Sequence, residues 1–447
     1  MPAAQGLLHT GSRLDLTQQG RSTIEASINL SALIQEAVAK EDAFSEYDEV
    51  EQLQGGLHHE GCAASAFLTD AIEPEPQHTQ SYRNAKRRAS RKKRVQENGH
   101  APSKRTKLEH IQLADAVQAD VSIANLPAAE GAYGAKNLAE SAASREHEYT
   151  AEELVAERGF RLVEWDGREA MPITDREGRI FAVLAGRPSD PTYGAACAAA
   201  FETISAERDK ADFKREECNH RRGQFPALAF GLSQGNGQPS ARRLNEGNHA
   251  STIRALQGHS SISRIASFGD AAFSTWAPKL YRFYGGYMAR VEEKTGETRN
   301  FPGSVFACAT VNFGPRVRTF KHRDVLNLAF GLCAITALGR FDHKKGGHVI
   351  LWEAKLVVQF PPGSTILIPS ATVTHSNTAI GEHETRASFT QYAGGGVFRW
   401  VDNEYQTFEA LKKKNRAKYE ENIEKNKTRW QEGLKLYSKL SELTADL

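Results

Sequence analysis

Seven short apolar or alternating runs follow one another between Phe301 and Tyr392, and they constrain the fold more than any other feature of the chain. Turn signals such as DHKKGG and PPGS separate them. Short strands at this density are typical of an all-β barrel or sandwich. We therefore expect a β-rich core over 301–402. The runs are SVFACATVNF, LAFGLCAITALG, HVILW, KLVVQF, TILIP, TVTHSN and RASFTQY.

Helical and strand patterns precede this core and begin near Thr150, which forms a capping-box pattern with Glu153. The turn TDREGR predicts a hairpin. Aromatic residues recur at helical spacing in FSTWAPKLYRFYGGYM, which favours a helix packed on the sheet over a base-stacking surface. The expected elements are a helix over 151–159, strands over 160–165 and 179–186, and helices over about 192–214 and 250–293.

Residues 1–145 are expected to be largely disordered, because they are rich in Ala, Gln, Glu, Ser and Gly and have few aromatic residues. One short helix is expected around Leu30–Ala39. Residues 83–107 hold eleven Lys or Arg and a single Glu. Such a run is typical of a nuclear import signal or a nucleic-acid arm, and the alternative is a solvated charge run. We favour the first interpretation, which predicts a nuclear protein that the import machinery recognises through 83–107.

Residues 409–447 are rich in Lys and Glu and are expected to form a charged C-terminal helix. For its basic opening, 412–418, a solvated face is favoured over a surface laid against phosphates. The five cysteines are scattered without a C-x-x-C pair, so neither a disulfide framework nor a zinc module is indicated. No run of about 18 apolar residues occurs, so we expect no membrane partner.

A candidate metal site lies among the predicted strands. His322 and Asp324 are two residues apart, and on an extended segment such positions point the same way. His375 follows 51 residues after Asp324. Two histidines and one carboxylate on one face, with open positions opposite, are the ligand set of non-haem Fe(II) oxygenases. We therefore predict that His322, Asp324 and His375 bind the metal and are catalytic.

A candidate cosubstrate site follows the last of these ligands. Arg386 comes 11 residues after His375, and Ser388 stands beside it in an R-x-S arrangement. An Arg fork and a hydroxyl suit the bidentate capture of a carboxylate. The whole set predicts an Fe(II)/2-oxoglutarate dioxygenase site that uses Fe(II), 2-oxoglutarate and O₂, with Tyr392 as a further hydrogen-bonding candidate. For His348, a place in the site and a structural role are equally favoured.

The positions of these residues along the runs also predict the topology. The His-x-Asp precedes the second run, the distal histidine lies on the sixth, and the arginine lies on the seventh. That order matches a double-stranded β-helix, or jelly roll. We expect an α+β fold in which a jelly-roll core at 301–402 and supporting N-terminal helices form a dioxygenase domain over 146–408.

At these residues the chain resembles the TET/JBP family of DNA-base dioxygenases, which oxidise the methyl groups of 5-methylcytosine or thymine. The H-R-D-x-x-N pattern of TET-type members is present at 322–327, and their T-R-x-S pattern is present at 385–388. The stretch from about Ser267 to Asp402 looks like the fungal, transposon-associated branch, with its APKLY, SVFACAT, HRDVLN, H-S-N and R-A-S-F-T-Q-Y segments. The Cys-rich zinc-binding segment of animal members is absent.

The resemblance implies oxidation of 5-methylcytosine in duplex DNA to 5-hydroxymethylcytosine, with further rounds to formyl and carboxyl products. A methyl group inside a duplex cannot reach a buried metal, so the nucleotide must be extruded. By resemblance, Asn327 would hydrogen-bond the flipped base. Arg316, Arg318 and Lys321 are candidates for phosphate contacts, and solvent-facing charge is an equally favoured alternative.

Two other functions remain open from the sequence. The same chemistry could act on another substrate, such as an N-methylated base, RNA or a protein side chain, because the motif specifies the oxidant more than the substrate. A non-enzymatic chromatin-binding protein could also keep the barrel without turnover, although the intact ligand set argues against this alternative.

Overall fold

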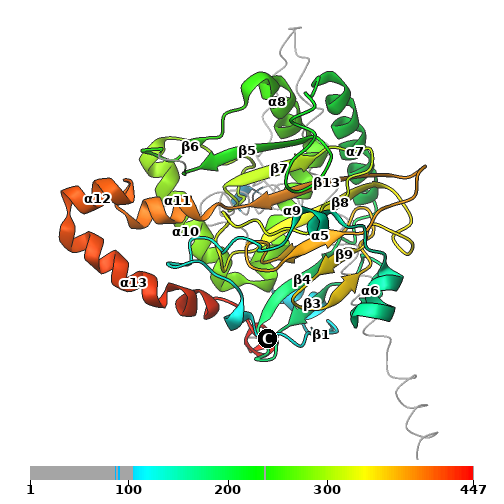
Figure 1. Cartoon of the computed structure of the whole chain (residues 1–447), viewed down its shortest axis with the longest axis horizontal. Helices are drawn as coiled ribbons and strands as arrows, with labels where there is room; N and C mark the ends of the chain where they lie inside the picture. The colour runs from blue at the N-terminus through cyan, green and yellow to red at the C-terminus, as the bar shows by residue number, and fades with distance from the viewer. Residues whose placement is uncertain (1–85, 87–88, 91–103, 236–237, 446–447) are drawn as a thin grey trace, which may run out of the picture. The chain divides into compact units, whose positions relative to one another are not determined.

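Two mixed β-sheets and a series of helices make up the part of the chain that the computed structural model describes, which is residue 86 and residues 89–90, 104–235 and 238–445 (Figure 1). These elements lie in one compact unit, Pro76–Leu447. The strands are β1 (Val117–Gln118), β2 (Arg161–Val163), β3 (Met171–Thr174), β4 (Ile180–Gly186), β5 (Ala227–Ser233), β6 (Arg242–Arg243), β7 (Cys308–Asn312), β8 (Cys333–Arg340), β9 (Val349–Leu351), β10 (Leu356–Val358), β11 (Thr365–Ile368), β12 (His375–Asn377) and β13 (Thr385–Tyr392).

The helices flank these strands and also follow them. They are α4 (Lys104–His110), α5 (Ala142–Glu146), α6 (Ala151–Arg158), α7 (Tyr193–Lys210), α8 (Ala250–Gly258), α9 (Ser260–Trp276), α10 (Pro278–Thr295), α11 (Gly395–Asp402), α12 (Phe408–Lys414), α13 (Arg416–Leu434) and α14 (Leu440–Thr444), with 3-10 turns at Ile123–Asn125 and Gly247–His249. The fold is therefore α+β, as expected.

Each of the seven predicted runs carries one strand, β7 to β13. Within the described residues, one sheet has nine strands in the order β1-β3-β4-β11-β8-β13-β7-β5-β6, and the other has four in the order β12-β9-β10-β2. Most neighbours are antiparallel, whereas β1 pairs with β3, and β2 with β10, in parallel. The finer assignment to a jelly roll stays a prediction.

Strand β13 lies near the centre of the large sheet, and its side chains point alternately to the two faces of that sheet. Side chains alternate along a strand. Ala387 and Phe389 are buried in a cluster with residues of α7, α8 and α9. Arg386 and Ser388 therefore point to the opposite face, away from these helices. This alternation places polar side chains in the interior on the face that the helices leave free.

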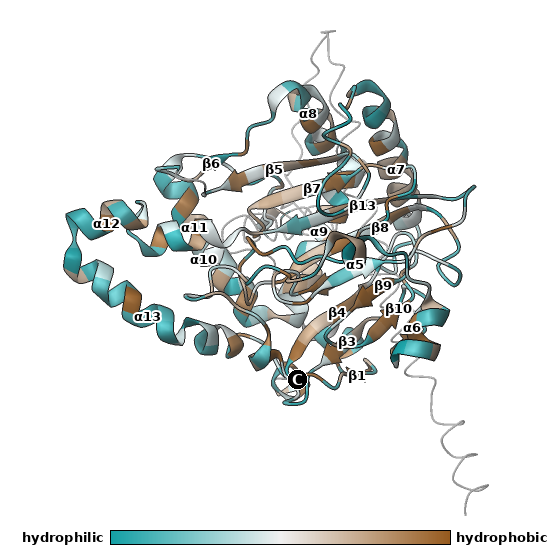
Figure 2. Cartoon of the chain, viewed as in Figure 1, coloured by the Kyte–Doolittle hydropathy of each residue, from teal (hydrophilic) through white to brown (hydrophobic). Residues whose placement is uncertain are grey.

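The helix predicted over 250–293 is three helices, α8, α9 and α10. Pro278 is the first residue of α10, and proline suits this position because it has no N–H to leave unpaired. The aromatic residues pack inward as expected: Phe273, Trp276 and Tyr284 are all buried. Figure 2 shows hydrophobic residues gathered on β3, β4 and β9, whereas α12 and α13 are mostly hydrophilic.

Helix α6 begins where its capping pattern predicts. The Thr150 side chain accepts a hydrogen bond from the Glu153 amide at 3.1 Å, and Gly159 ends the helix in a left-handed conformation. Leu154 and Phe160 pack with Ile350 of the small sheet. The predicted strand at 160–165 is β2, which joins that same sheet.

The predicted hairpin at TDREGR is present, but its first strand is β3 and not the strand at 160–165. β3 contains Pro172, and its four-residue length gave no alternating pattern in the sequence. The single C-terminal helix predicted over 409–447 is also wrong, because α12, α13 and α14 are separate helices. The Asn415 side chain caps α13 by accepting from the Lys418 amide.

The predicted disorder of 1–145 is wrong for 104–145. Strand β1 pairs with β3, and Ile111, Ile123 and Leu126 are buried in the main core. These apolar residues are widely spaced and show no periodicity, so only their tertiary partners order them. The predicted helix at Leu30–Ala39 and most of the basic run 83–107 lie outside the described residues.

No helix in the described part of the chain is long and apolar enough to cross a membrane. Among the same residues, Cys197, Cys218, Cys308 and Cys333 are free thiols. No disulfide therefore contributes to the described structure.

Candidate metal centre

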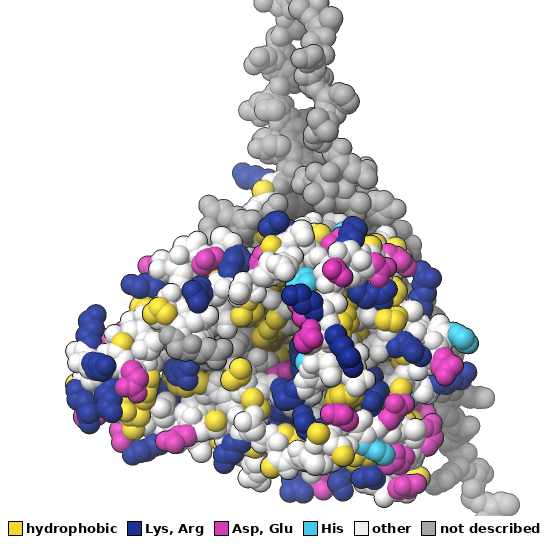
Figure 3. Space-filling model, turned by 45° about the horizontal axis from the view of Figure 1, so that its top comes forward, with side chains coloured by type: hydrophobic (Ala, Val, Ile, Leu, Met, Phe, Trp, Pro, Cys, Tyr) yellow, Lys and Arg dark blue, Asp and Glu magenta, His cyan; other side chains and the backbone are white. Residues whose placement is uncertain are grey.

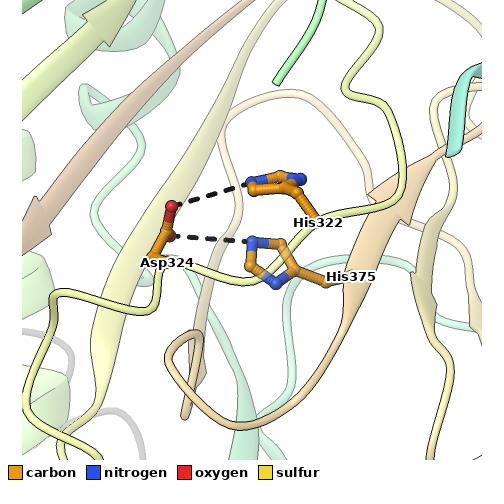
Figure 4. Close-up of side chains that lie close together, drawn as sticks. All are labelled: His322, Asp324 and His375. Carbon is orange, nitrogen blue, oxygen red and sulfur yellow. Dashed lines mark ion pairs between the residues drawn. The ribbon is translucent and has the colours of Figure 1, made fainter. Parts of the chain in front are cut away.

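The three predicted metal ligands converge in the structure (Figure 4). The Nε2 atom of His322 lies 3.8 Å from Asp324 Oδ1, and the Nε2 atom of His375 lies 3.9 Å from Asp324 Oδ2. The ligand atoms all lie within 4.8 Å of one another. Both histidines are buried, whereas the Asp324 side chain is 23% exposed. The cluster is thus open on the carboxylate side.

Backbone pairing holds the two histidines opposite each other. The His322 amide donates to the His375 carbonyl at 3.1 Å, and the His375 amide donates to the His322 carbonyl at 2.9 Å. Opposed residues of an antiparallel pair project to the same side. The Asp324 amide donates to the Ser370 carbonyl at 2.9 Å, which ties the loop of the first two ligands to the segment that leads into β12.

Both imidazoles are oriented by hydrogen bonds from their other ring nitrogen. His322 Nδ1 lies 2.7 Å from the Phe320 carbonyl, and His375 Nδ1 lies 3.0 Å from the Val373 carbonyl. A carbonyl only accepts, so each Nδ1 carries the proton and each Nε2 keeps a free lone pair. Metal-binding histidines are typically fixed in this way. Both Nε2 atoms are therefore in the form that binds a metal ion.

Electrostatics favour a neutral His322 and an ionised Asp324. Burial, reinforced by the neighbouring His375, lowers the pKa of His322 to about 3, so this imidazole is neutral. Burial alone would raise the pKa of Asp324, but His322, His375 and two nearby arginines outweigh it and hold that pKa below its ordinary value. Neutral imidazoles and an ionised carboxylate are the forms that coordinate a divalent cation.

The predicted cosubstrate residue Arg386 is a buried cation, only 3% exposed. Its Nη1 donates to the Val317 carbonyl at 3.1 Å, its Nε has no hydrogen-bond partner, and its guanidinium lies 5.9 Å from the Phe341 ring. Burial lowers the pKa of Arg386 to about 10, so it remains charged at neutral pH. No acidic residue in the described part of the chain pairs with it. A buried charge of this kind normally requires a counter-ion.

Ser388 lies on the same face of β13 as Arg386 and accepts a hydrogen bond from Asn312 Nδ2 at 2.9 Å. Asn312 Oδ1 is buried without a partner. Further along this face, Thr310 Oγ1 donates to Tyr392 Oη at 3.4 Å. The positions opposite Ser388 and Arg386 on β8 are Ala337 and Gly339. The absence of a side chain at Gly339 lets the two strands approach closely, since a Cβ there would lie 2.2 Å from the Thr385 carbonyl oxygen.

Asn327, the predicted base contact, is buried beside the metal cluster. Its Nδ2 donates to Ser370 Oγ at 3.2 Å and to Cys333 Sγ at 3.4 Å, and these two acceptors lie 2.8 Å apart. The Asn327 amide donates to the Asp324 carbonyl at 2.8 Å. This small polar cluster therefore also fixes the loop that carries Asp324. Ser370 and Cys333 had no motif that could have identified them.

The predicted phosphate contacts separate into two groups. Arg316 is exposed, has no ion pair with another described residue, and lies beside Arg386. Arg318 bonds the Glu146 carbonyl and lies 3.6 Å from Glu148, and Lys321 pairs with Glu140 at 2.5 Å. Of these three cations, only Arg316 therefore presents a free charge.

His348 lies outside the candidate site. Its Nδ1 bonds Thr378 Oγ1 at 3.0 Å. Side chains alternate along an extended segment, so His348 points to the same face of the small sheet as Ile350, two residues later. Ile350 packs on α6 on that face. The structural alternative is therefore the one observed.

Two arginines near the metal cluster, Arg221 and Arg222, were not predicted from the sequence to lie there. Arg221 donates to the Arg323 carbonyl at 3.0 Å, and the Arg222 carbonyl accepts from the Phe320 amide at 2.8 Å. Both arginines contribute to the low pKa of Asp324. Arg221 and Arg323 are 102 residues apart in the sequence, and only the tertiary fold brings them together.

Comparisons with known proteins give distant matches. No protein-family model matches the chain, and no curated protein does. One solved structure, described as NgTET1 in complex with 5mC DNA, is 11% identical and covers 53% of this chain and 83% of that one, with a TM-score of 0.37. An oxidoreductase of the 2OG-Fe(II) oxygenase family from Burkholderia pseudomallei is 14% identical. The match covers 46% of this chain and 91% of that one, with a TM-score of 0.26. The functional assignment therefore depends on the residues of the site.

Proposed function

We propose that the chain is an Fe(II)- and 2-oxoglutarate-dependent dioxygenase that oxidises the methyl group of 5-methylcytosine in DNA. The observation that carries the oxygenase assignment is the pairing of two features in one interior. His322, Asp324 and His375 form a cluster whose ligand atoms converge, and Arg386 is a buried cation without an acidic partner among the described residues. A dicarboxylate could bind a metal ion at the cluster with one end and pair with the Arg386 guanidinium with the other.

Each residue has a separate task in this proposal. The two Nε2 atoms and the Asp324 carboxylate would hold the metal, and Arg386, with Ser388, would hold the distal carboxylate of 2-oxoglutarate. Bound iron would supply the activation of O₂ for hydroxylation of a C–H bond. The hydrogen bonds from Nδ1 to backbone carbonyls keep both imidazoles from rotating and leave Nε2 as the atom that would bind the metal.

The substrate assignment is supported by the H-R-D-x-x-N pattern at 322–327 and the T-R-x-S pattern at 385–388, which resemble the TET/JBP family. Positive charge at Arg316, Arg221 and Arg222 suits a polyanionic substrate. The duplex would have to release the nucleotide into the site, because the two histidines are buried.

The test is turnover on a panel of substrates. Purified protein with Fe(II) and 2-oxoglutarate is incubated with methylated DNA, unmodified DNA and methylated RNA, and nucleosides are measured by mass spectrometry. We expect 5-hydroxymethylcytosine from methylated DNA only. Succinate could instead form with an N-methylated base, RNA or a protein, without a hydroxymethyl product from DNA. That result would overturn the substrate assignment and leave the oxygenase assignment intact.

The metal assignment has its own control. We expect His322→Ala and Asp324→Ala to abolish turnover, because each removes a ligand from a three-residue set. His348→Ala removes a buried histidine on the outer face of the small sheet. This variant should form the same products as wild type. Full activity of His322→Ala would refute the metal site.

We further propose that the protein is nuclear and that 83–107 is its import signal, supported by the eleven basic residues of that run. A fluorescent protein fused to 83–107 should accumulate in nuclei, and the same fusion with the basic residues replaced by Ala should not. Equal distribution of the two fusions would contradict this assignment.

A further inference from the structure

Leu326 is an exposed leucine in the loop that carries the metal ligands. It is 79% exposed, although it lies two residues after Asp324 and one before Asn327, which is only 8% exposed. Among the large apolar side chains of the described residues, only Leu113 is equally exposed, and Leu113 lies in a turn after α4. Single exposed apolar residues are common, so the surroundings of Leu326 decide whether its exposure matters.

The backbone on both sides of Leu326 is fixed. The Val325 carbonyl accepts from the Ala135 amide at 2.9 Å, and the Leu326 carbonyl accepts from the Gly395 amide at 2.9 Å. The neighbouring segments approach closely, since a Cβ at Gly395 would lie 1.5 Å from the Tyr133 carbonyl oxygen. A leucine held this way is presented to solvent on a rigid support and does not belong to a mobile loop tip.

Two exposed cations, Lys136 and Arg221, lie near this loop. Lys136, next to the residue that bonds Val325, is exposed and has no ion pair with another described residue. Arg221 is also exposed and donates to the Arg323 carbonyl, whereas Arg323 itself is only 6% exposed and donates to the Asn137 carbonyl. The nearby Glu140 is already paired with Lys321. The surface beside Leu326 therefore favours a polyanion.

Leu326 also lies at the end of the site opposite Arg386. Asn327 is bridged to Gly394, just beyond the end of β13, whereas Arg386 lies near the start of that strand. A substrate that enters from the Leu326 end would meet Asp324, the partly exposed ligand, before it reached Arg386.

We propose that Leu326 enters the base stack beside the nucleotide that is oxidised and fills the space which that nucleotide leaves. This inference rests on the proposed function. An extruded base leaves an unstacked gap, and an apolar side chain inserted there offsets the cost of unstacking. The adjacent cations would hold the flanking phosphates.

The experiment compares duplex with single-stranded methylated DNA for wild type, Leu326→Ala and Leu326→Asp. Leu113→Asp is the matched control, because that leucine has the same exposure at a remote position. We expect Leu326→Ala to lower turnover on the duplex about tenfold and turnover on the single strand by less than about twofold, since a single strand has no gap to fill. Leu326→Asp should lower duplex turnover further, and Leu113→Asp should match wild type.

A fluorescent base analogue next to the target gives an independent readout. Its emission should rise when wild type binds the duplex and rise less with Leu326→Ala, whereas metal and 2-oxoglutarate binding should be equal for the two proteins. An unchanged ratio of duplex to single-strand turnover in Leu326→Ala would overturn the inference and leave the proposed function intact. Wild-type protein that oxidises no methylated DNA of either form would overturn both.

Discussion

At the residue scale, the surroundings of each polar side chain decide its chemistry. His322 and His375 could be structural histidines by sequence alone, but backbone carbonyls at their Nδ1 atoms leave both Nε2 atoms free to face Asp324. Arg386 differs in that its surroundings are incomplete. It is buried beside Phe341 with an unpartnered Nε. The role predicted for Arg386 therefore follows from the absence of an acidic partner among the described residues.

Arg386→Met should weaken 2-oxoglutarate binding about 10- to 100-fold, because hydrogen bonds to a charged group contribute about 1.5–3 kcal/mol. The free energy of unfolding of the ligand-free protein should stay the same or rise, because a buried cation without a counter-ion is removed. Calorimetric titration with 2-oxoglutarate and urea unfolding measure the two effects. Arg340→Met, at an exposed Arg that pairs with Glu202, is the control and should bind normally. Normal binding by Arg386→Met would contradict the cosubstrate role.

Asp270 predicts a pH dependence that is separate from the active site. It is buried and accepts hydrogen bonds from the Val305 amide and the Tyr281 hydroxyl, both at 2.7 Å. Burial raises its pKa to about 6, above the ordinary value of 3.8. The folded state therefore binds this proton more tightly than the unfolded state. The resulting stability is full below pH about 4 and is lost as the pH rises through about 6.

Asp270→Asn should remove this dependence, because the amide cannot ionise. Between pH 4 and pH 7.5, we expect the free energy of unfolding of wild type to fall by about 2–3 kcal/mol relative to the variant. Urea unfolding of both proteins at the two pH values measures the difference, and other titrating groups cancel. Parallel pH profiles for the two proteins would show that Asp270 does not titrate in this range.

At the element scale, β13 connects the helical layer to the site. Ala387 and Phe389 pack on one side with α7, α8 and α9, and Arg386 and Ser388 project to the other. A one-residue shift of this strand would exchange the two sets and place the guanidinium against the helices. The pairing of β13 with both β7 and β8 prevents that shift, so the placement of Arg386 and Ser388 depends on the register of three strands.

The C-terminal helices carry two kinds of lysine. In α13, Lys425 and Lys427 pair with Glu421 and Glu424, whereas 412–414 at the end of α12 have no ion pair with another described residue. Figure 3 shows Lys and Arg gathered at the end of the molecule that α12 and α13 form. The solvated face was predicted for 412–418, in which Arg416 and Lys418 pair with Glu420 and Glu421, whereas the lysines of α12 have no such partner and could contact phosphates.

Replacing Lys412, Lys413 and Lys414 by Glu should weaken binding to methylated duplex DNA. The slope of log affinity against log salt should fall by about 0.9 for each phosphate that these lysines neutralise in the wild-type complex. Binding is measured by fluorescence anisotropy over a range of salt concentrations. Replacement of Lys425 and Lys427 by Glu is the control. Equal salt slopes for wild type and the α12 variant would favour a fully solvated face.

At the scale of the whole molecule, the segment 104–145 belongs to the fold. It contributes β1, buried Ile123 and Leu126, and the amide of Ala135 that bonds the metal-ligand loop. The domain boundary expected at residue 145 would remove all of these contacts. The segment thus links the main core to the candidate site.

A chain of residues 146–447 should therefore be less stable than a chain of residues 76–447. Removal of the buried Ile111, Ile123 and Leu126 side chains alone should cost roughly 5 kcal/mol, which is comparable with the stability of an ordinary domain. Thermal unfolding followed by circular dichroism measures the difference, and a chain of residues 104–447 is the control. Equal midpoints for the 146–447 and 76–447 chains would contradict the role of the segment.

The sequence predicted the seven strands of the core, the helix after Thr150 and the H-x-D and R-x-S pairs of the candidate site, because each has a local signature. Alternation, turn residues and capping depend on neighbours within a few positions, and the H-x-D and R-x-S spacings are local as well. β3 and the segment 104–145 gave no such signature. The contacts of Ser370 with Asn327 and of Arg221 with Arg323 join residues far apart in sequence, and no local pattern indicates them.

By itself, then, the sequence determined which residues could bind a metal ion and a carboxylate, since their chemical groups and their order along the predicted strands are written in the chain. The tertiary structure alone decided that the two imidazoles present Nε2, that Arg386 is buried without an acidic partner among the described residues, and that Leu326 stays exposed while Asn327 beside it is buried. These properties depend on the backbone conformation that aims the carbonyl two residues before each histidine at its Nδ1, on strand register and on the exclusion of water, which come into being only when the chain folds.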